Sequence, residues 1–478
     1  MRVLTLVHRW LGILFCLLFA MWFASGIVMH FVPFPALTEA ERIAGLALIE
    51  GSPGLRSPAE AAGMVEGAAR VRLLQRVDRP VYLVSSGFGI KALGADDLSD
   101  AAVRSKNLAL AIATDHARRR KIDVTQTASA ELTAIDQWTV SGAFNRHRPL
   151  YRIALNDVGG TELYVSSSTG EVVGDTTRRE RGWNYIGSVA HWIYPIVLRS
   201  RAGIWNIMVW SLSLAALIAA LAGNLLGILK IKPGSGTGMS PYVDWHKWHH
   251  LLGLACMVFV VSWIFSGWLS MDSGRLFSTG APSSGETAKL AGVPAWNELS
   301  KAEWRRSAAA KEIDWFPFNG KLYRRERTGL DTQRLVALGA TARALQAFLE
   351  ADEVSAAVGR IAARCKAPSI IAADDSYVIP SSTLDAPVYR SVCGGVWYHV
   401  DGASGALLER SDRSSRAYRW LYNALHTMDI PALKAHPTLR SALIVILCGL
   451  GFLFSLTGVV IGWRRLRQQF SAPAANGG

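Results

Sequence analysis

Long apolar runs interrupt the chain at four places. They cover residues 10–32, 204–229, 251–269 and 439–463. A helix needs about 20 residues to cross a bilayer core of about 30 Å, so each run is long enough to span. The first run also exceeds the roughly 7–15 apolar residues of a signal peptide, which indicates a retained anchor. The pattern predicts four transmembrane helices.

The segment between the first two runs mixes helical and strand-like patterns. Ser57-Pro58 is typical of a helix start, because a capping serine and a proline suit the first turn. Alternation of apolar and polar residues predicts strand pairs over 71–86 and over 151–155 with 162–173. A second helix is expected over 99–119. We therefore predict an α+β domain with antiparallel strands.

The segment between the last two runs follows the same plan. Strands are expected at 320–327, 388–392 and 396–400, with a helix over 332–349. The predicted fold is thus an α-helical membrane protein with four transmembrane helices and two α+β periplasmic domains. An aromatic, apolar stretch precedes the second and the fourth helix, and we place both stretches at the membrane surface.

The two halves of the chain repeat each other. A shift of 241 positions matches His8/His249, Gly12/Gly253, Trp22/Trp263 and Ser25-Gly26/Ser266-Gly267. A shift of 235 positions matches Gly170/Gly405, Arg178/Arg413, Arg181/Arg416, His191/His426, Gly223/Gly458 and Gly227/Gly462. Six landmarks in one ungapped register are difficult to attribute to chance. The chain is predicted to be a tandem duplication with parallel repeats, related by an axis along the membrane normal.

Charge gives the predicted orientation. The formal net charge is +14, but the short segments that we assign to the cytoplasm hold a cluster of basic residues and only Asp244 as an acid. The basic residues are Arg2, Arg9, Lys230, Lys232, Lys247, Arg464, Arg465 and Arg467. This is the positive-inside pattern, so both termini are expected in the cytoplasm of a multi-pass inner-membrane protein. Membrane lipid, not nucleic acid, is the expected partner of this charge.

These patterns together define the predicted domains. Transmembrane helices are predicted at 1–32, 204–229, 249–270 and 438–463. Periplasmic domains are predicted at 33–182 and 271–417, interfacial segments at 183–203 and 418–437, and cytoplasmic segments at 230–248 and 464–478.

Four of the eleven histidines fall on matched positions of the repeat. His8 pairs with His249 at the cytoplasmic ends of two helices, and His191 pairs with His426 near the opposite membrane face. Two imidazoles that face each other across an axis can supply both axial ligands of a haem iron. Each pair is therefore a candidate haem site. Trp22 and Trp263 are expected to line a porphyrin face.

Several other histidines leave alternatives open. His30 is an alternative ligand near His191 and His426, while His246 and His250 flank His249 and compete with it. We expect His116, His147, His399 and His436 at the surface of the outside domains.

The five cysteines point to one disulfide. Cys16, Cys256 and Cys448 lie within membrane spans and are expected to pack as small apolar residues. Cys365 and Cys393 share the second outside domain, where an oxidising compartment would allow them to pair. The sequence has no CxxCH motif, so a covalently attached haem is not expected.

Several of these stretches resemble a known family. "VHRWLG" at the first helix, "WHKWHHLLG" at the third, and the strand-and-turn stretches "LYVSSSTGEVVG" and "VWYHVDGASGALLE" are similar to the PepSY-associated transmembrane family. This family includes inner-membrane di-haem reductases of ferric siderophores. The resemblance implies two b-type haems and outward electron transfer to a ferric siderophore or another ferric chelate. No dinucleotide-binding fingerprint is present, so the donor is expected to be a quinol or a cytoplasmic reductase.

The resemblance also supports a second hypothesis. The PepSY module is associated with the regulation of peptidases, so the chain is alternatively a non-catalytic membrane protein that binds a periplasmic peptide or peptidase. A redox-active visible spectrum distinguishes the two, because a binding protein of this kind would be colourless.

Overall fold

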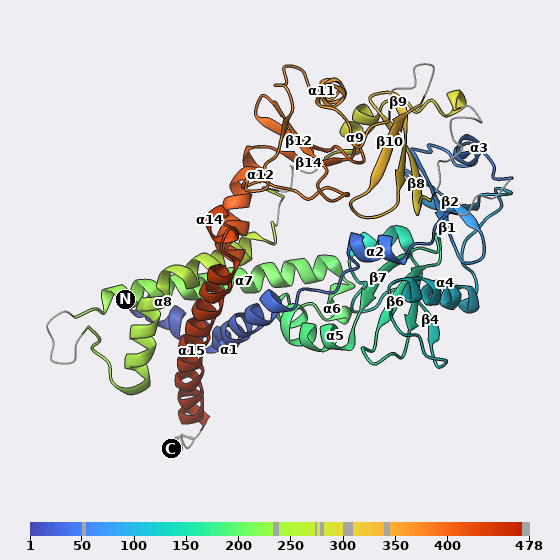
Figure 1. Cartoon of the computed structure of the whole chain (residues 1–478). Helices are drawn as coiled ribbons and strands as arrows, with labels where there is room; N and C mark the ends of the chain where they lie inside the picture. Colours follow the sequence, from blue (N-terminus) through green and yellow to red (C-terminus); the bar gives the residue numbers. More distant parts are fainter. Residues whose placement is uncertain are drawn as a thin grey trace. The chain divides into compact units, whose positions relative to one another are not determined.

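The computed structural model divides the chain into two compact units. It describes residues 1–49, 54–232, 239–272, 275–277, 282–299, 309–338 and 345–470. The helical unit comprises Met1–Phe34, Gly182–Ser278 and Ser415–Gly478. The sheet unit comprises Pro35–Arg181 and Thr279–Ser414. Both are drawn in Figure 1.

Four long helices form the core of the helical unit. They are α1 (Arg2–Phe31), α7 (Ala202–Leu229), α8 (Asp244–Leu269) and α15 (Pro437–Phe470) (Figure 1). Each helix is long and apolar enough to cross a membrane. The chain is therefore a multi-pass membrane protein, as the apolar runs predict. The third helix begins five residues earlier than predicted and includes both His246 and His249.

The helices pack through small and aromatic residues. Phe23, Cys256, Trp263 and Cys448 lie in one buried cluster. A Cβ atom at Gly451 would lie 2.7 Å from the Phe23 ring, so α1 and α15 approach too closely for any larger residue there. The three cysteines of this unit are free, as expected for residues that only pack.

Short helical pieces precede α7 and α15. The first group is α5 (Arg178–Asn184), a π-helical segment at Tyr185–Val189 and α6 (Ile196–Arg199). The second group is α12 (Arg413–Tyr418), a π-helical segment at Arg419–Ala424, α13 (Leu425–Thr427) and α14 (Pro431–Lys434). Both groups thus contain the same rare π-helical turn.

A six-stranded sheet joins the segment between α1 and α7 to the segment between α8 and α15. Its order is β10 (Gln333–Ala337), β9 (Lys321–Arg327), β8 (Glu312–Phe318), β1 (Arg70–Gln75), β2 (Pro80–Ser86) and β3 (Gly89–Gly94). The central pair is antiparallel, with Val71 opposite Trp315. The two predicted outside domains therefore share one sheet in a single unit.

Each of these two segments also contributes a four-stranded antiparallel sheet. One is β4 (Ser129–Thr133), β5 (Leu150–Ala154), β6 (Glu162–Ser166) and β7 (Val172–Thr176). The other is β11 (Ser369–Ile370), β12 (Val388–Cys393), β13 (Val396–Asp401) and β14 (Leu407–Ser411). Their registers shift at Tyr164/Val165 and at His399/Val400, which are 235 positions apart.

Helices cover these sheets. They are α2 (Glu39–Gly45), α3 (Pro58–Gly63), α4 (Lys106–Arg119), α9 (Ser284–Ala291) and α11 (Ala351–Gly359), with short 3-10 turns at Gly142–His147 and Trp296–Glu298. The predicted start of α3 is confirmed, because Ser57 caps it and Pro58 opens it. The α4 helix begins at Lys106 rather than at 99, because Ser105 caps it there.

One predicted helix is wrong. The helix expected over 332–349 is strand β10 in its first part, because Gln333, Leu335 and Ala337 alternate into the core and pair with β9. Residues 339–344 lie outside the described part of the chain.

Two histidines expected at the surface are buried. The His399 side chain is fully enclosed, with Nδ1 2.7 Å from Glu409 Oε2, while Arg390 Nε donates to its Nε2. His116 is 4% exposed and packs against Gly45. Burial lowers the pKa of His116 to about 4, because a charged imidazole would lose its hydration there.

A buried ionic cluster lies where β1 meets β8. Glu312 forms ion pairs with Arg42 and Arg72 and is almost completely enclosed. Burial alone would raise the pKa of Glu312, but the surrounding guanidinium groups outweigh it and hold this pKa well below the usual range. The cluster ties α2 to strands from both segments of the sheet unit.

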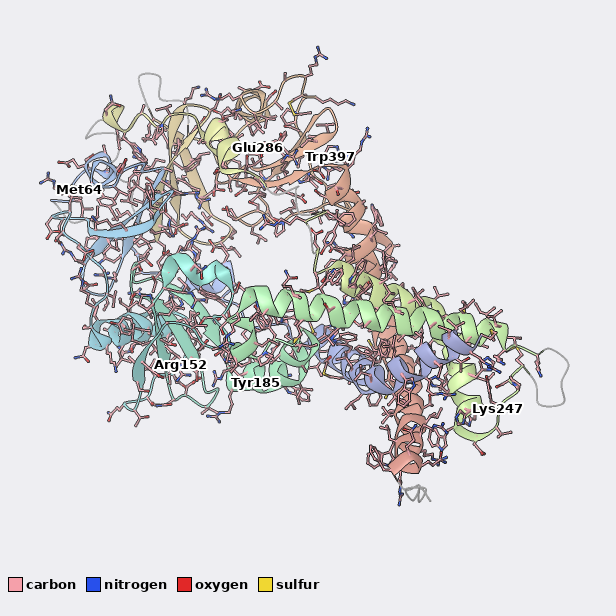
Figure 2. All side chains as sticks on the ribbon, turned by 180° about the vertical axis from the view of Figure 1, so that it is seen from behind. Met64, Arg152, Tyr185, Lys247, Glu286 and Trp397 are labelled. Atoms are coloured by element: carbon pink, nitrogen blue, oxygen red, sulfur yellow. A yellow bond between two sulfur atoms is a disulfide. The ribbon has the colours of Figure 1, made fainter. Side chains whose placement is uncertain are left out.

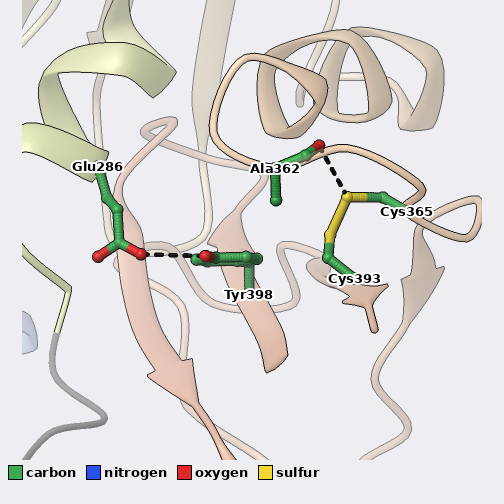
Figure 3. The surroundings of a disulfide bond; sticks show 5 residues. All are labelled: Glu286, Ala362, Cys365, Cys393 and Tyr398. Carbon is green, nitrogen blue, oxygen red and sulfur yellow. Dashed lines mark hydrogen bonds between the residues drawn. A yellow bond between two sulfur atoms is a disulfide. The ribbon is translucent and has the colours of Figure 1, made fainter. Parts of the chain in front are cut away.

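Cys365 and Cys393 form a disulfide in the structure (Figure 3). It connects the chain after α11 to the end of β12, next to Ala362, whose carbonyl oxygen lies 3.3 Å from Cys365 Sγ. The same figure shows Tyr398 of β13 donating its hydroxyl to Glu286 of α9. Both contacts fix helices against the β11–β14 sheet.

Candidate haem-binding histidine pairs

The structure brings together both histidine pairs that the repeat predicts. The ring centres of His8 and His249 are 6.2 Å apart, with an angle of 37° between the rings. The ring centres of His191 and His426 are also 6.2 Å apart, at 71°. We call these the first and the second pair. All four residues belong to the helical unit.

The two pairs lie at different levels of this unit. His8 is in the second turn of α1, whereas His191 is bonded to Ser25, which is 17 residues further along the same helix. At 1.5 Å per residue, this separates the levels by about 25 Å. Figure 2 labels Lys247, two positions before His249, and Tyr185, six positions before His191, and these two residues lie at opposite ends of the helical unit.

Each residue of the second pair comes two positions after a π-helical segment. These segments end at Val189 and Ala424, and the ligand candidates are His191 and His426. A π-helical turn adds one residue to a helix and rotates the residues after it, and such turns are frequent at functional sites. In both halves, the added residue therefore changes the direction in which the histidine after the π-helical segment points.

Hydrogen bonds fix the orientation of the second pair. His191 Nδ1 is 3.0 Å from Ser25 Oγ, and His426 Nδ1 is 3.1 Å from Ser266 Oγ. Ser25 and Ser266 each donate their own hydroxyl proton to a backbone carbonyl one turn back, so their oxygens accept from the imidazoles. Both rings therefore carry the proton on Nδ1.

The first pair has the same tautomer. His8 Nδ1 is 3.2 Å from the carbonyl of Ala219, and His249 Nδ1 is 2.8 Å from Thr457 Oγ1. Thr457 donates its own proton to a carbonyl of its helix. A protonated and bonded Nδ1 leaves the Nε2 lone pair as the basic site of each ring. This arrangement, in which the second nitrogen is anchored, is typical of histidines that bind metals.

The spacing of both pairs fits one iron atom between two imidazoles. A bond from a metal to an imidazole nitrogen is about 2.0–2.1 Å. The nitrogen of a five-membered ring lies about 1.1 Å from the ring centre, given ring bonds of about 1.33 Å. Two such ligands in line place the ring centres about 6.2 Å apart. Both measured separations have this value.

A glycine lies against every one of the four imidazoles. A Cβ atom added at Gly223 would be 2.6 Å from His8 Cε1, and one at Gly267 would be 3.2 Å from His426 Cε1. Gly458 and Gly26 stand in the same relation to His249 and His191, at 3.5 and 3.7 Å. Each of the four imidazoles therefore packs directly against a glycine at a matched position.

A large cavity adjoins the second pair. It has a volume of about 600 Å³ and is bordered by both His191 and His426. Its walls are largely aromatic and aliphatic, and they include Trp22, Trp263 and Ile264. A flat apolar macrocycle needs a wide slot of this kind, with the two ligands on opposite sides of it. The residues at this level therefore fit a haem.

The alternative histidines have other contacts. His30 Nε2 is 2.8 Å from Ser441 Oγ, at the edge of the cavity. His250 uses both ring nitrogens, toward Ser240 Oγ and the carbonyl of Gly227. His246 is exposed on the first turn of α8. Of the candidates near the N-terminus of α8, it is His249 that faces His8.

Larger metal clusters are absent from the described residues. Across these ranges, no group of three or more His, Cys, Asp or Glu side chains could hold a metal ion. The four histidines on matched positions instead lie two by two, His8 with His249 and His191 with His426.

A family comparison agrees with this architecture. The family model described as "PepSY-associated TM region" matches residues 5–465. The chain belongs to this family. No curated protein matches it. The match spans the four membrane helices and both sheet-forming segments between them, so the family's similarity extends over nearly the whole chain.

In this PepSY-associated chain, the residues that contact the histidines of the second pair also follow the sequence repeat. Ser25-Gly26 and Ser266-Gly267 match under the same shift as His8 and His249, but the serines are not predicted to contact a histidine. In the structure, each serine accepts the Nδ1 proton of an imidazole and each glycine lies beneath it. The π-helical turns have no comparable signal, because they depend on how the chain docks on α1 and α8.

Proposed function

We propose that the protein is a membrane oxidoreductase with two b-type haems, held by His8 with His249 and by His191 with His426. The observation that carries the proposal is the equal 6.2 Å separation of the two imidazole pairs. Aromatic contacts alone occur over a wide range of centroid distances, from about 4.5 to 7 Å. The Nδ1 anchors, the glycines and the cavity favour ligation over simple packing.

The protein's own residues would hold and tune the cofactors. When bound, each haem supplies a one-electron redox couple. Ser25, Ser266, Thr457 and the Ala219 carbonyl keep the imidazoles in the Nδ1–H form and fix their planes. Hydrogen bonds to Nδ1 raise the basicity of Nε2, which strengthens ligation of the oxidised metal. The apolar walls around the second pair exclude water from it.

The internal repeat supports pairing across an axis. Matched positions carry matched structure: the π-helical segments precede His191 and His426, and the strand irregularities fall at Tyr164/Val165 and His399/Val400. A duplicated helix-and-domain unit would produce two ligand pairs at two depths, because each repeat supplies one member to each pair.

The orientation that we propose has both termini in the cytoplasm of an inner membrane. The basic residues of the short segments support it. A cysteine placed at position 236, which lies outside the described residues, should then react with an impermeant thiol reagent only from the cytoplasmic side. Labelling from the periplasmic side alone would reverse the orientation.

The acceptor that we propose is a ferric siderophore or another ferric chelate on the periplasmic side. One electron from a quinol or a cytoplasmic reductase converts bound iron(III) to iron(II), and the donor is oxidised by the same amount. Iron(II) carries less charge and is held more weakly by hard oxygen ligands, so it leaves the chelate. No side chain is required as an acid or base in this step.

Reduction across a sealed membrane tests the function. Vesicles carrying the oriented protein, a reductant inside and a ferric chelate outside should produce iron(II) outside, detected with a colorimetric iron(II) chelator. His426→Ala should abolish this signal, while His246→Ala, which changes an exposed histidine, should preserve it. A colourless wild-type protein without reductase activity would instead favour the peptide-binding or peptidase-regulating alternative.

A further inference from the structure

The cavity beside the second histidine pair is polar on one part of its rim. Arg440, His30 and Thr427 border it there, whereas tryptophan and aliphatic side chains form most of the wall. Arg440 is the one lysine or arginine among the residues described as lining this cavity. A fixed cation at the edge of an apolar slot can form a charge-assisted hydrogen bond with an anionic group on a molecule that occupies the slot.

Hydrogen bonds hold this cation in place. Arg440 Nε and Nη2 donate to the carbonyl of Thr427, at 3.2 and 2.6 Å. Thr427 directly follows His426, so the guanidinium is tied to the segment that carries one of the proposed ligands. His30 is held next to it, because its Nε2 is 2.8 Å from the hydroxyl of Ser441.

The rim departs from the internal symmetry of the chain. Arg440 stands 235 positions after Trp205, and His30 corresponds to Met271 at the shift of 241. All four residues line the cavity. One half of the rim is thus basic where the matched half is aromatic and apolar. The two histidines are equivalent by the repeat, but the rim is not.

We propose that Arg440, with His30 beside it, binds a carboxylate of the porphyrin held between His191 and His426. This rests on the proposed function. A b-type porphyrin carries its two carboxylates on one edge, and the rest of its ring is apolar. An arginine accepts a carboxylate through parallel hydrogen bonds, which gives both strength and a fixed orientation. The basic half of the rim therefore selects which way round the ring enters the cavity.

Loss of this cation should change the reduction potential of one haem only. Reduction adds negative charge at the iron, and a nearby positive charge favours it. In Arg440→Gln, we expect the equilibrium constant for reduction of one haem to fall about tenfold. For a one-electron couple, this lowers its reduction potential by about 59 mV. The other haem should keep its wild-type potential. Redox titration of the purified full-length protein, followed by its visible spectrum, measures both potentials.

Two further variants make the result specific. Arg201→Gln removes an exposed arginine just before α7 that does not border the cavity, and it should leave both potentials unchanged. Arg440→Lys keeps the positive charge but loses the parallel hydrogen bonds. Its reduction potential should therefore be close to that of the wild type. This variant also reports on the site if Arg440→Gln does not accumulate.

Three results would contradict the inference. One is an Arg440→Gln protein with two haems and both potentials unchanged. Another is an unchanged pair of potentials with weaker binding of an anionic ferric chelate, which would assign the arginine to a carboxylate of the chelate. The third is a wild-type protein without haem, which would overturn the proposed function as well and is thereby distinguishable from the first two.

Discussion

At the scale of single residues, glycine and imidazole are paired throughout the proposed haem sites. Gly223 is the tightest case, because a Cβ atom there would lie 2.6 Å from His8 Cε1. Real Cβ contacts are longer, so any side chain at this position must displace the imidazole. The displacement would move Nε2 away from the line that joins the first pair.

We therefore predict that Gly223→Ala lowers the haem content at the first pair. The expected result is loss of up to one haem per chain, or a change of its spectrum to that of a haem with a weakened axial ligand. Gly12→Ala is the matched control, because nothing lies within 4 Å of a Cβ atom at that position of the same unit. Equal haem content and spectra in both variants would show that Gly223 does not position His8.

His116 gives a prediction for pH. Its pKa is lowered to about 4 by burial, whereas an unfolded histidine has a pKa near 6.5. The unfolded chain therefore takes up the proton first, and the free energy of unfolding should fall as the pH drops from about 6.5 to about 4. The shift corresponds to about 3 kcal/mol for one such group.

The measurement is the thermal or denaturant unfolding of the protein in detergent across this pH range, in the wild type and in His116→Gln. In the variant, the free energy of unfolding should depend less on pH than in the wild type. The same dependence of this free energy on pH in both proteins would show that His116 does not cause it. His436→Gln serves as a control, since His436 is exposed in the structure.

At the scale of elements, the antiparallel pair β1–β8 links the two segments of the chain that form the sheet unit. Glu312 on β8 reaches Arg42 on α2 and Arg72 on β1. Removal of one partner from a buried ionic cluster leaves the others without compensation, which typically costs about 3–5 kcal/mol. The stability of the sheet unit should therefore depend strongly on this one carboxylate.

We predict that Glu312→Gln lowers the free energy of unfolding by about 3–5 kcal/mol, because the guanidinium groups around it stay charged. Glu131→Gln is the control: this glutamate pairs with Arg152 on the surface, where such a pair contributes about 0–1 kcal/mol. Chemical denaturation of the two variants provides the comparison. Similar stabilities would contradict the role that we assign to the cluster.

The strands show how far the sequence predicts the elements. The alternating stretches at 71–86, 320–327, 388–392 and 396–400 are strands in the structure, because their periodicity of two is local information. The pairing of Val71 with Trp315 is not local, and no periodicity reveals it. The predicted helix over 332–349 fails for the same reason, since β10 is stabilised by its pairing with β9.

At the scale of the whole molecule, the matched sequence positions of the two halves carry most of the information that the sequence holds about the candidate site. Two independent shifts, 241 and 235, match each of the four histidines with a partner, and the structure places both pairs of rings at the same separation. The role that we propose for Arg440 could not be predicted in this way, because the matched position in the other half is Trp205. Comparison of matched positions identifies features that both halves share. The difference between the two halves of the cavity rim becomes visible only in the structure.

The most direct test of this account is the number of haems per chain in the purified protein. We predict two in the wild type, with the visible spectrum of low-spin haem ligated by two imidazoles. His426→Ala should retain about one haem, which dithionite still reduces, and His8→Ala should also retain about one. Two full equivalents with unchanged spectra in His8→Ala, His191→Ala and His426→Ala would contradict the assignment of the pairs.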